Sequence, residues 1–294
     1  MVINKYFTLF IFILYSGCTS NPFWEDNRTK KIKIQGYVNK ESIVSDVAVF
    51  VFIEDLNVST YTDTLGSFSL ELPNLEMENG IFSGAVKVHY YIHNYKAVYS
   101  TLYITNGRLT REQIDFDENG ILVEPITLDK LASFELSIDN IWKRSNGDTL
   151  KFSLAITSKH HPFSYYSYVN IRLDPRRFVS SGILLKSMQS GSVYYDKNDT
   201  DLLQKIDILP NETNILEFEV EPNGFFPFII DNYISLEQQL VQSGLHEILP
   251  YIYIIQEDVP DELFNHIGIQ NVSIIGASFL KMPIDLVRGS LLIQ

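Results

Sequence analysis

The chain has 294 residues, of which 23 are Lys or Arg and 36 are Asp or Glu, so its net charge is -13. This excess of acidic over basic residues argues against a nucleic-acid partner, because phosphate contacts need concentrated Lys and Arg side chains. Hydrophobic residues make up 45% of the chain and charged residues 20%, which is the balance of a folded protein. The length predicts about two domains.

The N-terminus has the pattern of an export signal. Lys5 precedes an apolar run from Tyr6 to Tyr15, and Ser16, Gly17 and Cys18 follow. A run of about ten residues suits a signal peptide and is too short for a membrane-spanning helix of about 20 residues. We therefore predict a signal peptide over residues 1–17.

The end of this segment resembles the lipobox of bacterial lipoproteins, in which small residues precede a cysteine. The usual Leu three places before that cysteine is Tyr15 here, with Leu14 one place earlier. The resemblance implies that Cys18 is lipidated and becomes the mature N-terminus. The expected location is then the cell envelope, in the outer membrane, on its periplasmic or its surface face. A bacterial or eukaryotic secretory signal that contains a cysteine by chance is the alternative.

Cys18 is the only cysteine of the chain. An exported protein with one Cys forms no internal disulfide, and lipidation would consume a thiol that is a liability in an oxidising compartment. Residues 19–30 are polar, contain Pro22 and lack periodicity, so we predict a lipidated tether over residues 18–30.

The pattern of residues 31–130 predicts a series of short strands. Period-two alternation with turn residues every 8 to 12 positions is typical of an antiparallel β-sandwich. The candidate strands are Ile32–Val38, Val47–Ile53, Thr60–Thr64, Ser67–Leu72, Ala85–Ile92, Ala97–Ile104 and Ile121–Leu128.

Four segments of this region carry a resemblance: Gly36–Val38, Val47–Val51, Thr62–Leu70 and Pro73. Together they resemble the carboxypeptidase regulatory-like domain, a transthyretin-like β-sandwich found as an accessory module without catalytic residues. The residues themselves predict a structural turn. Asp63 can accept backbone N–H bonds, Gly66 can take a positive φ, and Phe68 then enters the core.

Residues 131–294 predict a second β-rich domain, an immunoglobulin-like or related sandwich. The candidate strands are Phe134–Ile138, Thr149–Thr157, Tyr165–Leu173 and Asn214–Val220, then Tyr251–Ile255 and Val272–Ile275, with an edge strand over Leu286–Ile293. Asn146 and Gly147 predict a hairpin turn. One short helix is expected in residues 231–249, with Ser235 as N-cap and its end near Ser243, and a turn is expected over Pro260–Phe264.

The chain carries none of the common catalytic or cofactor motifs: no G-x-S-x-G, H-E-x-x-H, Walker loop or G-x-G-x-x-G occurs. We therefore expect no catalytic residue and no cofactor. The adjacent His160 and His161 would point to opposite faces of an extended segment, and His89 and His93 would lie roughly 13 Å apart along a strand, so neither pair alone predicts a metal site.

A weak calcium pattern occurs at Asp115, Asp117 and Asn119, the oxygen-ligand positions 1, 3 and 5 of a calcium loop, with Gly120 at position 6. Position 12, which needs a bidentate Glu, is Ile126. An acidic connecting loop is the alternative, and it is the one we favour.

Tyrosine and phenylalanine are abundant, with 17 and 19 residues. Exposed aromatic rings stack on sugars, so Phe163, Tyr165, Tyr166 and Tyr168 are candidate ligand-binding residues, as are Tyr90, Tyr91 and Tyr95. Because alternate residues of a strand face opposite sides, part of each run is expected to enter the core.

These patterns lead to one functional expectation and two alternatives. We expect an envelope lipoprotein, held at the membrane by its N-terminal lipid, with a non-catalytic binding or assembly role and an envelope protein or a glycan as partner. A surface glycan-binding lipoprotein is the first alternative. A hydrolase with its site in the second domain is the other, and a cleft with converging carboxylates would favour it.

Overall fold

The computed structural model is mainly β and describes residues 31–39, 46–77, 80–111, 113–139, 141–143, 147–167, 182–196, 204–220, 225–227, 241–269, 276–285 and 287–294. The predicted signal peptide, Cys18 and the tether lie outside these residues. Within them, no helix combines the length and the apolar character that a bilayer crossing requires.

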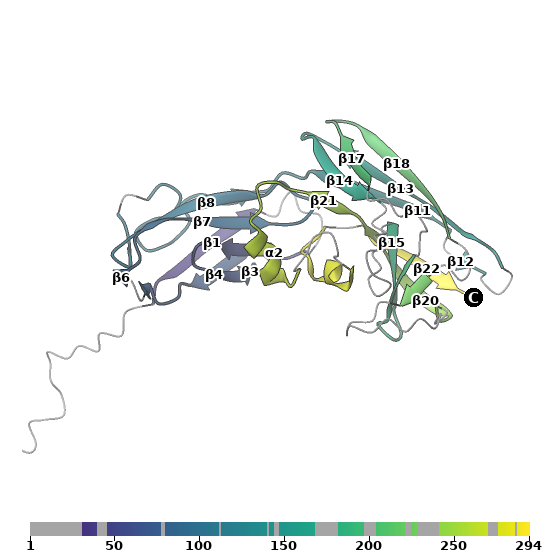
Figure 1. The fold of residues 1–294 in the computed structure, drawn as a ribbon, viewed down its shortest axis with the longest axis horizontal. Coiled ribbons are helices and arrows are strands. Elements are labelled where there is room, and N and C mark those ends of the chain that lie inside the picture. The colour runs from purple at the N-terminus through teal and green to yellow at the C-terminus, as the bar shows by residue number, and fades with distance from the viewer. Residues whose placement is uncertain are drawn as a thin grey trace, which may run out of the picture.

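Residues 33–127 form a β-sandwich at one end of the elongated molecule (Figure 1). One sheet has the order β10-β1-β4 and the other has the order β3-β2-β7-β8-β9. Strands β5 and β6 pair with each other in a small two-stranded sheet. The strands are β1 (Lys33–Asn39), β2 (Phe50–Ile53), β3 (Val58–Tyr61), β4 (Ser67–Glu71), β5 (Glu76–Met77), β6 (Gly80–Ile81), β7 (Gly84–Tyr91), β8 (Val98–Thr105), β9 (Arg108–Leu109) and β10 (Ile126–Thr127).

Alternation along each strand explains how the two sheets pack. In β1 the side chains of Ile34 and Val38 are buried, whereas Lys33, Gln35 and Tyr37 are exposed. The buried set meets the apolar residues of β2, β7 and β8 from the facing sheet in one core. Period-two patterning therefore places one face of each strand inside the sandwich, as the sequence predicts.

Residues 132–293 build three sheets around a second core. Their orders are β11-β13-β18, β12-β22-β20-β15-β16-β19 and β17-β14-β21. The strands are β11 (Ala132–Ile138), β12 (Ile141–Trp142), β13 (Leu150–Ser158), β14 (Phe163–Ser167), β15 (Gly182–Ser187), β16 (Val193–Asp196), β17 (Gln204–Ile208), β18 (Thr213–Val220), β19 (Phe225–Pro227), β20 (Gly244–Tyr251), β21 (Tyr253–Ile255) and β22 (Gly289–Ile293).

The helix expected between Ser235 and Ser243 lies mostly outside the described residues, and another helix occurs where a turn was expected. Residues 228–240, which hold most of the expected helix, lie outside the described residues, and Gly244–Leu249, which follow its expected end, pair with β15 and β22 as part of β20. The described α-helix is α2 (Asp261–Ile267), where a turn was expected. It has Pro260 before it, acidic residues in its first turn and Gly268 after it.

Two further expectations for the second half need correction. The C-terminal strand β22 is not an edge strand, because it lies between β12 and β20. Strands β11 and β13 do pair antiparallel, but the segment between them contains β12, so Gly147 does not close a tight two-residue hairpin. Asn146, Tyr168–Leu173 and Val272–Ile275 lie outside the described residues.

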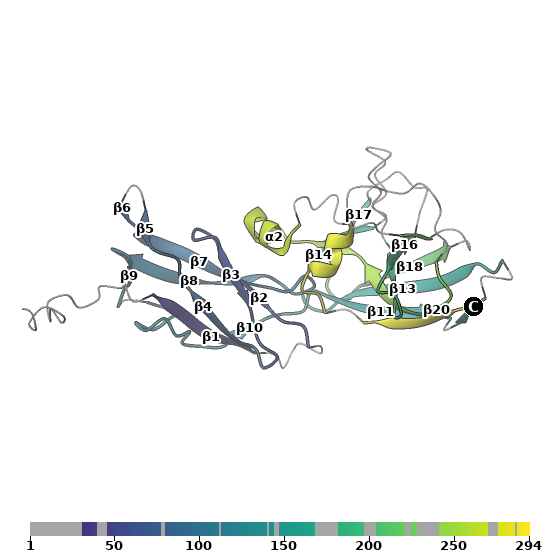
Figure 2. The same cartoon turned by 90° about the horizontal axis from the view of Figure 1, so that it is seen from below.

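A third apolar cluster joins the two halves. Phe50, Phe52 and Tyr91 of the first sandwich pack against α2 and against residues of β20 and β21. Figure 2 shows α2 on the side of the β3-β2-β7-β8-β9 sheet that faces away from β1 and β4. Part of that outer sheet face is therefore covered by the second half of the chain.

Candidate functional site

The predicted turn at Asp63 has a defined geometry. The Asp63 Oδ1 atom accepts N–H bonds from Leu65 at 2.9 Å and from Ser67 at 2.8 Å. Gly66 has a φ of 95°, and Phe68 is buried. The carbonyl of Gly66 also accepts the N–H of Val38 in β1, so the turn fixes the start of β4 beside β1.

The calcium candidate contains a second turn of the same kind. The Asp117 Oδ1 atom accepts N–H bonds from Asn119 at 2.9 Å and from Ile121 at 2.8 Å, and Gly120 has a φ of 82°. These backbone bonds hold the pKa of Asp117 below its usual value, and the bond from Ile121 has the largest effect. The Asp-x-x-Gly spacing therefore indicates a turn here, and the Asp117 carboxylate accepts the backbone N–H bonds of that turn.

Asp115 has a different structural use. Its Oδ2 atom accepts the N–H of Thr101 at 2.7 Å, and the side chain of Gln113 bonds both the N–H and the carbonyl of Tyr103. These two side chains take the place of a neighbouring strand along the part of β8 that does not pair with β9. Unpaired strand edges invite pairing with other chains, so this arrangement protects the edge.

No cluster of three or more His, Cys, Asp or Glu residues suitable for a metal ion occurs among the described residues. The candidate calcium ligands Asp115, Asp117 and Asn119 are held by the turn and by the edge of β8, as above. His161 lies in the loop after β13, with its Nε2 atom 3.5 Å from Asp129. His89 in β7 bonds Glu54 at 3.0 Å.

The aromatic residues singled out in the sequence do not form an exposed platform. Phe163 and Tyr165 are buried in the core of the second half, and the Tyr165 hydroxyl accepts a bond from Asn214. Tyr166 is half-buried and stacks on Tyr253 with ring centroids 6.3 Å apart. Tyr168 lies outside the described residues. Tyr90 and Tyr91 at the end of β7, and Tyr95 in the turn after it, are fully buried, because packing between the layers covers both faces of the sheet there.

His93 lies at the junction of the two halves and is fully buried. Its Nε2 atom accepts the N–H of Ile254 at 2.9 Å, so the neutral ring carries its proton on Nδ1 and donates to the Tyr91 hydroxyl at 2.8 Å. Burial lowers the pKa of His93 to about 3. The ring is therefore a neutral connector between the halves.

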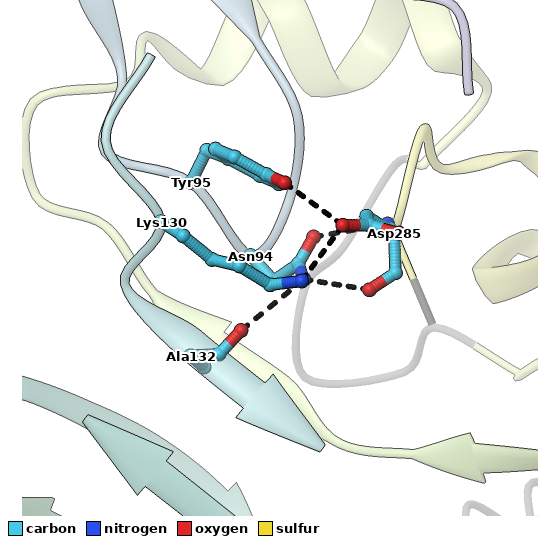
Figure 3. Close-up of polar contacts among 5 residues, drawn as sticks. All are labelled: Asn94, Tyr95, Lys130, Ala132 and Asp285. Carbon is cyan, nitrogen blue, oxygen red and sulfur yellow. Dashed lines mark hydrogen bonds and ion pairs between the residues drawn. The ribbon is translucent and has the colours of Figure 1, made fainter. Parts of the chain in front are cut away.

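A second buried polar group at the junction centres on Asp285, which belongs to the C-terminal segment (Figure 3). One carboxylate oxygen accepts bonds from the Tyr95 hydroxyl and the Lys130 ammonium, each at 2.8 Å. The side chain of Asn94 bonds both the N–H and the carbonyl of Asp285, and also the carbonyl of Ala132. The burial of Tyr95, with Asp285 beside it, raises the pKa of that phenol.

These contacts assign a structural role to the Asp285 group. Every polar atom described above has a protein partner, as a buried polar group requires, and the bonds connect the C-terminal segment to the segments that hold Asn94 and Lys130. Asn94, Lys130 and Asp285 come from three separate segments of the chain. The junction is thus specified by tertiary contacts.

An open surface remains on the outer face of the first sandwich. We call it the β7–β8 face and define it by Ala85 and Lys87 of β7 and by Tyr99, Thr101 and Tyr103 of β8, with the buried His89 at its border beside Phe52. The paired positions are Ala85 with Tyr103, Lys87 with Thr101 and His89 with Tyr99. Tyr99 is 54% exposed, whereas Ser100, Leu102 and Ile104 face the core. This face was missed in the sequence, although the alternation along β8 could have indicated it.

No protein-family model and no curated protein matches the chain. Among solved structures, it is similar to a protein from Bacteroides uniformis that is provisionally assigned to carbohydrate binding, with 7% identity, a TM-score of 0.27, and coverage of 76% of this chain and 95% of that chain. It is also similar to a DUF3823 family protein from Bacteroides ovatus, with 11% identity and a TM-score of 0.25. The match covers 77% of this chain and 91% of that chain. TM-scores this low do not establish a common fold.

Proposed function

We propose that the chain is a lipid-anchored protein of the bacterial cell envelope that binds a glycan without catalysing a reaction. The anchor rests on Cys18, which follows the apolar run and small residues of an export signal and is the only cysteine of the chain. The polar residues 19–30 then separate the lipid from the first strand. In this arrangement the first sandwich serves as a carboxypeptidase regulatory-like accessory module.

The observation that carries the binding role is the β7–β8 face. It presents tyrosine side chains beside charged and hydroxyl groups on a rigid sheet, and such a combination suits a ligand with both C–H faces and hydroxyl groups. The sheet is held in place on one side by the junction and at its edge by Gln113 and Asp115. A preorganised surface loses little conformational entropy when a ligand binds.

The anchor is tested by the substitution Cys18→Ala in cells fed an alkyne fatty acid. The parent protein should take up the label and the variant should not, because the thiol is the acceptor of the lipid. Ser20→Ala, two places further along the tether, is the matched control and should be labelled normally. A labelled Cys18→Ala protein would contradict the anchor.

Binding is tested by affinity electrophoresis of the full mature chain in gels that contain single polysaccharides. The panel consists of polygalacturonate, chondroitin sulfate, galactomannan and xyloglucan. Retardation by at least one of them supports the proposal. Unchanged mobility in every gel would overturn the glycan-binding role and favour a protein partner.

A further inference from the structure

We infer that the β7–β8 face is the binding site and that its ligand is an acidic saccharide, one that carries carboxylate or sulfate groups. This inference deepens the proposed function and rests on it. It assigns a ligand class to the part of the outer sheet face that the second half of the chain leaves uncovered.

The strand register puts the relevant side chains on one surface. Residues 99, 101 and 103 of β8 alternate with buried neighbours, so their side chains project from the sheet on the same side. Their partners on β7 are residues 89, 87 and 85, whose side chains share that side. Thr105 pairs with Arg108 of β9, which extends the surface across a third strand.

Tyr99 is the central aromatic residue of this face. The Lys87 ammonium lies 5.0 Å from the centre of its ring, and the His89 ring lies 5.9 Å away. His89 is in turn held by Glu54 at 3.0 Å. A sugar ring that packs its C–H groups against Tyr99 would place an acidic substituent beside the Lys87 ammonium.

An open hollow of about 780 Å³ lies beside Tyr103 at the far end of the face. Gly84 and Ala85 line it and have almost no side chain, which leaves room next to the tyrosine ring. Thr110 and Arg111 line the same hollow and supply a hydroxyl and a guanidinium. The hollow therefore joins an aromatic side chain to hydrogen-bond donors suited to hydroxyl and acidic groups.

The local charge selects the ligand class. Lys87, Arg108 and Arg111 are exposed on or beside the face, and none of them enters an ion pair with another described residue. These three cations accompany two carboxylates that already have partners, that of Glu54 on His89 and that of Asp115 on the N–H of Thr101, on a chain whose net charge is -13. A negatively charged saccharide would be attracted to this region and repelled by most of the remaining surface, which would direct it to the face.

The experiment compares polygalacturonate and chondroitin sulfate with the neutral galactomannan and xyloglucan, and with polygalacturonate whose carboxylates are methyl-esterified. The full mature chain is compared with its variants Tyr99→Ala and Lys87→Ala. The matched controls are Tyr37→Ala, whose tyrosine is 41% exposed on the opposite sheet, and Lys33→Ala, which changes the net charge equally. Thermal unfolding shows whether each variant is folded.

We expect retention by an acidic polysaccharide that weakens on esterification and at high salt. Tyr99→Ala and Lys87→Ala should each weaken retention about tenfold, which corresponds to the loss of one desolvated cation–aromatic or charge-assisted contact. Tyr37→Ala and Lys33→Ala should bind as the parent does. If Tyr99→Ala does not fold, the result with Lys87→Ala decides.

Three results would overturn this inference. Retention by neutral polysaccharides alone would reject the acidic ligand. Retention that is unchanged in Tyr99→Ala and Lys87→Ala would reject the site, while the proposed glycan-binding function would stand. A chain that no polysaccharide retards would reject both.

Discussion

At the scale of single residues, one short motif is used twice in the first sandwich. Asp63 and Asp117 each accept two backbone N–H bonds, and Gly66 and Gly120 each follow three places later with a positive φ. The carbonyls of both glycines accept N–H groups from β1, one near each end of that strand. The turns thus direct both neighbours of β1 into place.

Gly66→Val should destabilise the protein by more than about 1 kcal/mol, because a β-branched side chain resists the positive φ of this turn. Gly84→Val is the control, since Gly84 is exposed in a strand, where Val is favoured. Urea unfolding of both variants measures the difference. An unchanged unfolding midpoint for Gly66→Val would show that the turn tolerates a branched residue.

At the scale of elements, α2 acts as a connector between the two halves. Leu263, Phe264 and Ile267 form its buried side, and they pack in the cluster that contains Phe50, Phe52 and Tyr91 of the first sandwich. The ring of Phe264 meets Tyr91 edge-on, with centroids 5.6 Å apart. The helix has only seven residues, so tertiary packing and not intrinsic propensity holds it.

Phe264→Ala should cost about 3 to 5 kcal/mol, because it empties a buried position in the cluster between the halves. Glu262→Ala on the exposed side of the same helix should change stability by less than about 0.5 kcal/mol. Chemical unfolding at pH 7 compares them. Equal stabilities of the two variants would mean that α2 does not contribute to the junction.

At the scale of the whole molecule, the junction connects the halves with buried polar groups as well as apolar ones. His93 bonds the backbone of β21, and Asp285 bonds Asn94, Tyr95 and Lys130. Because every one of these groups is buried or partly buried, separating the halves would expose them without their partners. We therefore regard the junction as rigid at neutral pH.

Acid should weaken this junction through His93. Its pKa of about 3 in the folded state lies below the value of about 6.5 expected in the unfolded chain, so the unfolded state binds the extra proton between these values. The contribution to stability is full above about pH 6.5 and falls as the pH is lowered toward 3. From pH 7 to pH 5 the loss is about 2 kcal/mol.

The variant His93→Gln, which has no proton to gain, isolates this effect. Its unfolding free energy should change between pH 7 and pH 5 by about 2 kcal/mol less than that of the parent protein. Urea unfolding at the two pH values measures both changes. The same pH dependence in parent and variant would rule out His93 as the acid-sensitive group.

Much of the fold could be predicted from the sequence because period-two alternation is a local property. Most strands of the first sandwich and the turn at Asp63 follow from residues that are neighbours in the chain. The residues of the calcium pattern form a turn and a contact with the edge of β8, because oxygen ligands and Asp-x-x-Gly turns use the same residue types. The position of α2 was missed although Pro260, Asp261 and Gly268 carried its boundary signals.

The sequence by itself determined the β-rich class and the direction in which alternate side chains point, and it predicts an export signal that ends at a single cysteine. Only the tertiary structure decided which aromatic residues are covered. Tyr90 and Tyr91 are buried and Tyr99 is exposed because the facing sheet and α2 cover different parts of the same strands. Burial depends on layers brought together from distant parts of the chain, and local periodicity specifies a face without specifying what lies on it.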